Sequence, residues 1–228
     1  MEYFGIFPQC GFSVSATNLY AARVITLGTL ISVYLTTSDE MLPILISESI
    51  SLTTILLILG IKLVVGILAG IVIDLVMRKK ENAEEKIEDI CEHEHCHCEK
   101  GIFKSAIKHT VSIFIFILIF NLIFNTLIHI IGEDVLKNSI LNMPILGTIL
   151  AGIIGLIPNC ASSVVLTELY VENIISMATM IAGLLVNAGV GTVVLFRTNK
   201  DLKENVKIIA LLYGIGVVSG VVLQLFGI

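Results

Sequence analysis

Two short stretches that each contain a cysteine are the residues of this chain best suited to chemistry. Residues 8–10 read Pro-Gln-Cys and residues 158–160 read Pro-Asn-Cys. Proline lacks a backbone N–H and interrupts helices, so both thiols are expected at a break in helical structure. A thiolate is a soft ligand and an amide oxygen is a hard one. Each stretch therefore offers a mixed site for a transition-metal or metalloid ion, although a small buried Cys is the ordinary alternative.

A second set of potential ligands lies in the polar segment 81–104. Six of the eight positions from 91 to 98 are Cys or His, interleaved with Glu. This composition is typical of zinc or similar transition-metal binding, and the alternative is a solvated linker. The spacing is not that of a folded zinc finger, so it predicts a flexible segment for metal capture or sensing. Metal binding by this segment needs reduced thiols, which favours a location on the cytosolic side. The expected metal ligands are Cys91, His93, His95, Cys96, His97 and Cys98.

The two Pro-x-Cys stretches belong to an internal repeat with a constant offset of 150 residues. Between residues 8 and 35, 11 of 28 positions are identical to the residue 150 positions later, without a gap. The same offset pairs Gly66 and Gly70 with Gly216 and Gly220, as two Gly-x-x-x-Gly motifs that favour close helix packing. Gene duplication is the simplest explanation, and each copy is expected to form one structural unit.

Composition places the chain in a membrane. Of its 228 residues, 56% are hydrophobic and 14% are charged, which is more apolar surface than a soluble domain of this size can bury. The apolar runs reach the roughly 20 residues that a helix needs to cross the bilayer. The predicted fold class is an all-α polytopic membrane protein.

The apolar runs and the repeat predict the elements and the domain organisation. A half-length helix over residues 12–22, with a broken start, leads into an apolar run over 23–35. Further spans are expected over residues 51–77, 107–131, 140–157, 174–196 and 208–226, with a second half-helix over 165–170 and a basic loop over 197–207. The first copy lacks counterparts of 107–131 and 140–157, so two helices are expected to be missing. We predict a first repeat over 1–78, a linker over 79–105 and a second repeat over 106–228.

The positions of Lys and Arg predict how the chain crosses the membrane. Basic residues at 78–80 and 100–108 place the metal-ligand linker in the cytoplasm. Residues 39–48 are acidic without a basic residue and are expected outside, whereas the equivalent segment of the second copy, 197–207, is basic and is expected inside. The sequence therefore predicts inverted-topology repeats in the plasma membrane, with discontinuous helices at the Pro-x-Cys breaks.

Unwound backbone at membrane depth is tolerated where it lines a cavity, so polar residues near the breaks are the candidate substrate ligands. Three of them are carboxylates that serve either as proton or cation carriers or, alternatively, as parts of external loops. No catalytic residue is expected. The predicted substrate-binding residues are Gln9, Cys10, Ser13, Asn18, Asp39, Glu40, Asn159, Cys160, Ser162, Ser163, Thr167 and Glu168.

Several of these motifs resemble a known family. They are Phe/Ile-Pro-x-Cys-x-x-Ser at 7–13 and 157–163, Arg-Val-Ile-Thr-Leu-Gly-Thr at 23–29, Thr-Ser-Asp-Glu at 37–40, the His/Cys linker and Lys-His-Thr at 108–110. Together they are similar to the ten-span heavy-metal exporters, described as arsenic efflux proteins or manganese transporters. The resemblance implies two five-helix units and a metal cargo, whereas about eight spans are counted here.

These observations predict a secondary-active efflux transporter for a heavy-metal or metalloid ion that works by alternating access. The cargo is manganese or an arsenite-like or soft divalent ion, because the candidate ligands include both thiols and oxygen donors. The chain has no Walker phosphate-binding loop, so neither ATP hydrolysis nor other enzyme activity is expected. A membrane thiol-disulfide carrier that uses Cys10 and Cys160 is one alternative, and a membrane metal sensor is another.

The expected partners follow from this function. They are the metal ion, the lipid bilayer and a second copy of the chain in a homodimer, without nucleic acid. No tightly bound cofactor is expected, and a transition-metal ion such as Zn or Mn would be either the substrate or the ligand of the linker.

Overall fold

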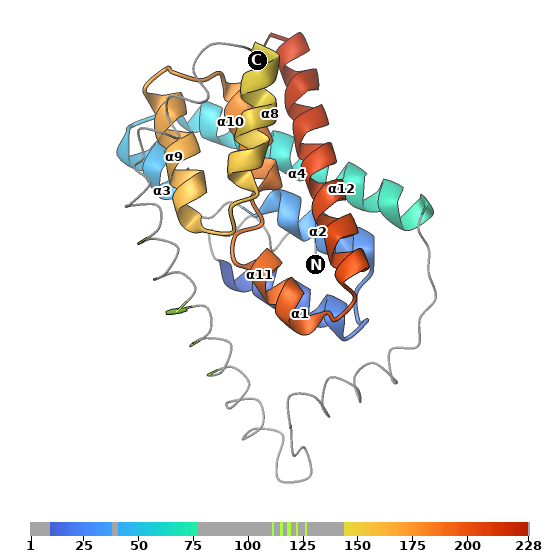
Figure 1. The fold of residues 1–228 in the computed structure, drawn as a ribbon. Helices are drawn as coiled ribbons and strands as arrows, with labels where there is room; N and C mark the ends of the chain where they lie inside the picture. The colour runs from blue at the N-terminus through green and yellow to red at the C-terminus, as the bar shows by residue number, and fades with distance from the viewer. Residues whose placement is uncertain are drawn as a thin grey trace.

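The computed structural model describes residues 10–37, 41–76 and 144–227, together with six isolated helical positions between 111 and 126. These residues form helices and turns, without a strand among them (Figure 1). By length and composition, three segments in this part of the chain can cross a membrane: Leu52–Val76, Met177–Thr198 and Leu202–Leu225. The prediction of a helical membrane protein is confirmed at this level.

The two copies have the same order of helices. The first copy contains α1 (Cys10–Ala21), α2 (Leu27–Thr36), α3 (Met41–Ser47) and α4 (Leu52–Val76). The second contains α8 (Pro144–Gly155), α9 (Cys160–Val171), α10 (Met177–Val186), α11 (Gly191–Thr198) and α12 (Leu202–Leu225). Helices α9 to α12 each begin 150 residues after the start of α1 to α4. The sequence offset therefore recurs in the helix boundaries.

Local signals explain why equivalent helices begin alike. Thr26 precedes α2 and Ser176 precedes α10, and each hydroxyl accepts a hydrogen bond of 3.2 Å from the backbone N–H three residues later. This is an ordinary N-cap, which satisfies one of the orphan donors of the first turn. The preceding turns also match, because Arg23 and Asn173 both adopt positive φ angles, 58° and 59°. Helix α2 thus begins at Leu27, later than the predicted run at 23.

The predicted span over 174–196 corresponds to the membrane-capable segment Met177–Thr198, but its helix is interrupted. Helix α10 ends at Val186 and α11 begins at Gly191. At the interruption the Asn187 side chain accepts a hydrogen bond of 2.9 Å from the Gly189 backbone N–H, and Gly189 has a φ of 56°. An Asx turn and a left-handed glycine both stop a helix. In the first copy α2 ends at Thr36 and α3 begins at Met41, which are the positions equivalent to Val186 and Gly191.

The predicted basic loop over 197–207 is too long. Helix α12 already begins at Leu202, so Lys203, Glu204 and Lys207 lie within its first two turns. The reason is the N-cap Asp201, whose carboxylate accepts hydrogen bonds of 3.0 and 3.2 Å from the backbone N–H groups of Lys203 and Glu204. A capped helix start accommodates charged residues that hydropathy alone assigns to a loop.

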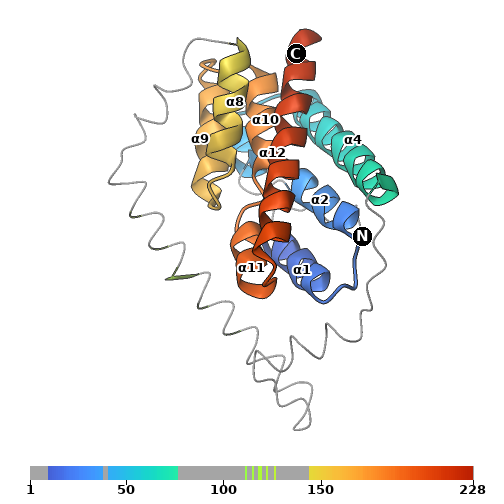
Figure 2. The same cartoon turned by 45° about the vertical axis from the view of Figure 1, so that its right-hand side comes forward.

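Helices α8 and α9 lie side by side and are joined by residues 156–159, which include Pro158 (Figures 1 and 2). Each has 12 residues. Such a helix is about 18 Å long, roughly half of the bilayer thickness. Pro158 therefore lies in the link between two half-length helices. The stretch before residue 10 lies outside the described residues.

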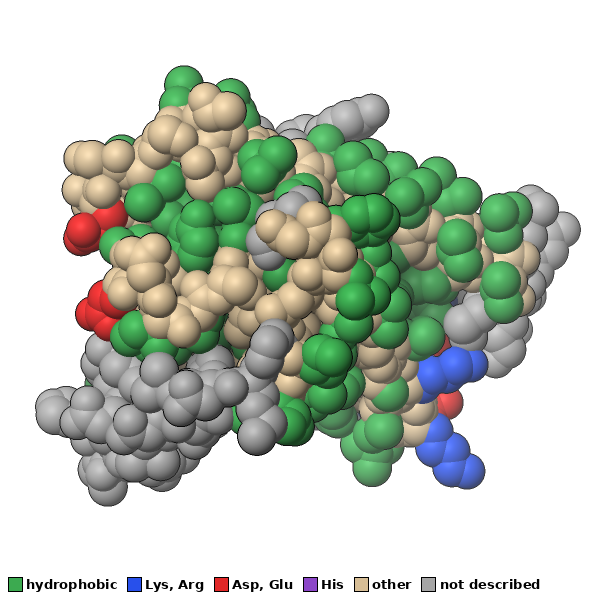
Figure 3. Space-filling view, turned by 90° about the horizontal axis from the view of Figure 1, so that it is seen from above, with side chains coloured by type: hydrophobic (Ala, Val, Ile, Leu, Met, Phe, Trp, Pro, Cys, Tyr) green, Lys and Arg blue, Asp and Glu red, His purple; other side chains and the backbone are tan. Residues whose placement is uncertain are grey.

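The long helices α4 and α12 face outward, whereas α10 is enclosed. Nine of the ten residues of α10 are buried. In contrast, α4 and α12 leave large apolar side chains exposed, among them Leu56, Leu68, Val72, Val206 and Val218. Seen from above, hydrophobic side chains cover much of the described surface, and Lys and Arg gather at one edge (Figure 3). An apolar exterior of this extent is suited to lipid contact.

The Gly-x-x-x-Gly motifs join each long helix to the middle helix of its own copy. A Cβ atom on Gly70 would lie 2.9 Å from the backbone oxygen of Gly28 in α2. A Cβ atom on Gly216 would lie 3.2 Å from the backbone oxygen of Ala182 in α10. The predicted packing role of these motifs is confirmed, because only glycine allows the helix backbones to approach this closely.

Candidate functional site

The short helices of one copy pack against the other copy. Helix α1 lies along α11, and α9 contacts α3, while α2 and α10 meet between them (Figures 1 and 2). The polar residues of α1 and α9 are therefore held where the copies meet. Helices α1 and α9 carry most of the described site residues that the sequence predicted.

Hydroxyl groups on α1 converge on the start of α11. Ser13 and Thr17 are fully buried. Thr17 Oγ1 lies 2.6 Å from the backbone oxygen of Ser13 and 3.2 Å from that of Gly191. The Tyr34 hydroxyl lies 3.1 Å from the same Gly191 oxygen and 2.5 Å from Thr17 Oγ1. Because each hydroxyl has one proton, a chain of shared hydrogen bonds connects α1, α2 and α11.

Gly191 is required at this contact. A Cβ atom there would lie 2.8 Å from the Ser13 Cβ atom and 3.0 Å from the Tyr34 ring. Any side chain would therefore displace α1 from the beginning of α11. The glycine lets the polar face of one copy reach the interrupted helix of the other.

The equivalent hydroxyls on α9 bond within their own helix. Ser162 donates to the backbone oxygen of Asn159 at 2.8 Å, Ser163 to that of Cys160 at 2.7 Å, and Thr167 to that of Ser163 at 2.7 Å. All three hydroxyls are buried. A hydroxyl that donates locally keeps its lone pairs as acceptors, so this face can present oxygen atoms to a cation.

The remaining predicted site residues are only partly described. Asn159 is buried before the first turn of α9, and Cys160 is partly exposed and present as a thiol. Asn18 and Glu168 occupy equivalent, partly exposed positions on α1 and α9. Gln9, Asp39, Glu40 and the linker ligands at 91–98 lie outside the described residues, as does the side chain of Cys10. Within the described ranges, no three His, Cys, Asp or Glu side chains are placed to hold a metal.

A buried lysine was missed by the sequence interpretation. Lys62, near the middle of α4, is 1% exposed. Its ammonium donates to the backbone oxygen of Thr37 and, at 3.3 Å, to that of Leu184. A signal was available, because Lys62 is the one charged residue in the apolar run 51–73. An ionisable residue inside a membrane span usually marks a functional position.

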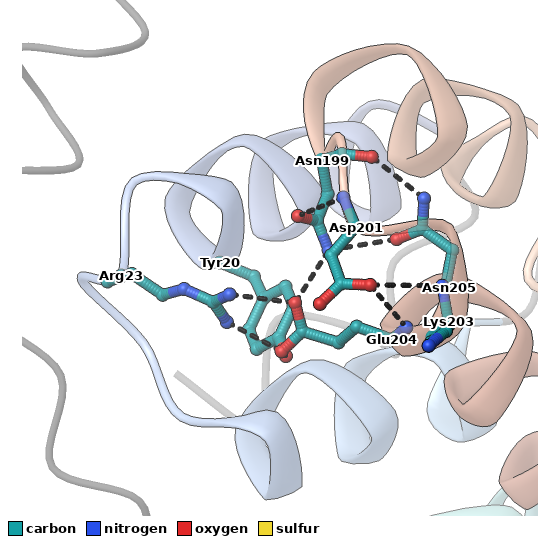
Figure 4. A network of polar contacts seen from close by, with 7 residues as sticks. All are labelled: Tyr20, Arg23, Asn199, Asp201, Lys203, Glu204 and Asn205. Atoms are coloured by element: carbon teal, nitrogen blue, oxygen red, sulfur yellow. Dashed lines mark hydrogen bonds and ion pairs between the residues drawn. The ribbon is translucent and has the colours of Figure 1, made fainter.

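An ion pair also joins the two copies at one end of α1 (Figure 4). The Arg23 guanidinium donates to both carboxylate oxygens of Glu204, at 2.9 and 2.7 Å. Glu204 accepts two further hydrogen bonds, one of 2.6 Å from the Tyr20 hydroxyl and one of 2.9 Å from the Asn199 side-chain amide. The Arg23 and Glu204 side chains are 11% and 23% exposed, so the pair is largely shielded from water.

Several contacts reinforce this network. The Arg23 guanidinium lies 4.9 Å from the centre of the Tyr20 ring, which is cation–π geometry. The hydrogen bonds that Arg23 donates to the Glu204 carboxylate raise the pKa of the guanidinium above its ordinary value, so it stays protonated. Asn205 and Asn199 exchange two hydrogen bonds of 2.8 Å, which fix the Asn199 amide that holds Glu204. The sequence interpretation missed this network because its members lie about 180 residues apart.

The fold and these contacts define a helical membrane protein whose two copies share a polar interior. Comparison with protein families identifies the class: the profile of a family described as "Putative, 10TM heavy-metal exporter" matches residues 2–123, more than half of the chain. The chain belongs to this family, as the sequence motifs predicted. No curated protein and no solved structure matches it.

Proposed function

We propose that this chain is a secondary-active efflux transporter for a heavy-metal or metalloid ion and that it works by alternating access. The observation that carries the proposal is the exchange of short helices, α1 against α11 and α9 against α3. Two copies that each hold the other's interrupted helix can rock as rigid bodies around a shared polar centre. Membership in a family of exporters supplies the class of cargo.

The cargo would bind near the two Pro-x-Cys stretches. Asn159 and Cys160 bring an amide oxygen and a thiol to the beginning of α9, and the buried hydroxyls of Ser163 and Thr167 follow along the same helix. Thiolates select arsenite, zinc or cadmium, whereas amide and carboxylate oxygens select manganese. The predicted sites in the first copy, Gln9 and Cys10, would complete the set from the opposite side.

The Arg23–Glu204 ion pair would close one side of the ion's transport path. Arg23 corresponds to Asn173 in the second copy and Glu204 corresponds to Thr54 in the first, and these two residues cannot form an ion pair. The pair lies beside Lys203 and Lys207, at the end expected to face the cytoplasm. Loading from the cytoplasm would then require this pair to separate, and its reformation would close that side before release.

Cellular metal content tests the proposal. Cells that express the chain and cells that lack it are compared for manganese, zinc, cadmium and arsenite by mass spectrometry, after membrane insertion has been verified. The expected result is a lower steady-state content of one of these ions. Unchanged content for all four, with the protein present in the membrane, would contradict the proposal.

A thiol-disulfide carrier is the second candidate, favoured by the partly exposed Cys160 thiol at the link between α8 and α9. In that case Cys10 and Cys160 would pass electrons across the bilayer by thiol exchange. Substitution of both by serine must abolish electron transfer, because serine has no redox chemistry. An exporter with both substitutions would retain some flux with altered ion preference, so the double variant separates the two functions.

A further inference from the structure

A carbonyl-lined position in the middle of the bundle is filled by a charge from the protein itself. Lys62 extends from α4 toward the place where α2 and α10 end, and its side chain is 1% exposed. There the ammonium donates to the backbone oxygens of Thr37 and Leu184. Thr37 belongs to the first copy and Leu184 to the second, so one side-chain nitrogen joins both copies.

These two oxygens belong to helix C-termini. Thr37 is the C-cap of α2, and Leu184 lies in the last turn of α10, whose C-cap is the equivalent residue Asn187. The last carbonyl groups of a helix lack intrahelical donors, and the helix dipole makes this end negative. Two such ends that meet inside a bundle attract a cation. Half-helix C-termini of this kind coordinate Na⁺ in several transporters.

The second copy shows that the fold itself does not need a lysine here. Lys62 lies on the buried face of α4 between Ile58 and Gly66. The equivalent buried position of α12, between Ile208 and Gly216, is Leu212. An apolar residue therefore satisfies the same packing position in the second copy, and the ammonium–carbonyl contacts of Lys62 are specific to the first copy.

We propose that the ends of α2 and α10 form a binding site for a monovalent cation and that the Lys62 ammonium is its resident ion. The tethered charge takes the place of a coupling Na⁺. The site itself follows from the geometry. The consequence that export is independent of Na⁺ rests on the function proposed above.

Removal of the lysine tests the site without any transport measurement. The full chain in detergent is unfolded thermally in choline chloride, NaCl, KCl and methylammonium chloride. For Lys62→Ala in choline we expect a loss of roughly 5 to 10 °C, because two buried carbonyl groups lose their donor. Na⁺, K⁺ or methylammonium should restore most of this loss in a saturable manner, because choline is too large for the vacated site. The wild-type protein should show no difference among the salts.

Leu212→Ala is the matched control, since it truncates the equivalent buried side chain without removing a charge. It should lose stability equally in all four salts. Lys62→Gln keeps a hydrogen-bond donor but has no charge, so it should be less stable than the wild type. Added cations should not restore its stability, because the glutamine side chain occupies the site.

Two outcomes overturn the proposal. One is a Lys62→Ala variant that is equally unstable in all four salts, and the other is a Lys62→Gln variant as stable as the wild type. If Lys62→Ala does not fold in any salt, the Lys62→Gln comparison decides. A failure to detect metal export would leave these stability results unaffected, so the two proposals fail separately.

Discussion

Individual polar residues make the two copies unequal although their helices correspond. Three polar residues of the first copy have apolar or neutral equivalents in the second. Leucine replaces Tyr34 at 184 and Lys62 at 212, and the neutral Asn173 replaces Arg23. Inverted copies that were identical would exchange conformations at equal free energy. Charged contacts present in only one arrangement shift that equilibrium, by as much as their contact energy differs between the two states.

The Arg23–Glu204 pair allows this effect to be measured. Arg23→Gln and Glu204→Gln should each destabilise the folded chain, because each leaves a largely buried partner charge. A double-mutant cycle should give a coupling free energy of about 1–3 kcal/mol, the range for hydrogen bonds to charged groups. Chemical or thermal unfolding in detergent measures it. Additive effects of the two substitutions would show that the pair contributes nothing to the closed arrangement.

At the scale of elements, close helix contact determines how α4 lies on α2. Gly70 meets the backbone of Gly28, and Gly66 would meet the Thr36 side chain if it carried a Cβ atom. The approach also brings the Asp74 carboxylate within 2.8 Å of the Gly28 backbone N–H at the beginning of α2. Packing and capping in the first copy therefore depend on the same small residues.

Gly70→Ala should consequently destabilise the protein by about 1–3 kcal/mol, the usual cost of overpacking. Its methyl group would press on backbone, which cannot rotate away. Gly60→Ala in the same helix is the matched control, because nothing lies within 4 Å of its added Cβ atom. The control should be neutral or slightly stabilising, given the higher helix propensity of alanine. Equal stability of the two variants, measured by thermal unfolding, would contradict the close contact between Gly70 of α4 and the backbone of α2.

Sequence patterns predicted the helices well where apolar length or repetition defined them. The half-helix at 12–22, the span at 51–77 and the packing glycines all correspond to described elements. The interruption at Asn187 was not predicted, because the hydropathy of 174–196 is continuous and one Asn and one Gly are weak breakers by themselves. The Arg23–Glu204 pair depends on contact between the copies, which no local pattern records.

At the scale of the whole molecule, the transport proposal depends on the prediction that the two copies have opposite orientations in the membrane. Residues 39–48 carry three acidic and no basic side chains, whereas residues 197–207, around the start of α12, carry four basic ones. Basic segments tend to stay in the cytoplasm, so this difference in charge predicts that the second copy is inserted in the reverse direction. Two similar sequences would then form a bundle with related inner and outer halves, as alternating access requires.

Thiol labelling measures this orientation directly. Ser47 and Lys200 are exposed residues in these two segments. In a chain with its five cysteines replaced, Ser47→Cys should react with a membrane-impermeant maleimide in intact cells, whereas Lys200→Cys should react only after permeabilisation. The cysteine-less chain controls for background, and a permeant maleimide verifies that both thiols are reactive. Labelling of both positions from the same side would show that the copies enter the membrane in one direction, and a mechanism that exchanges two inverted copies would then have no structural basis.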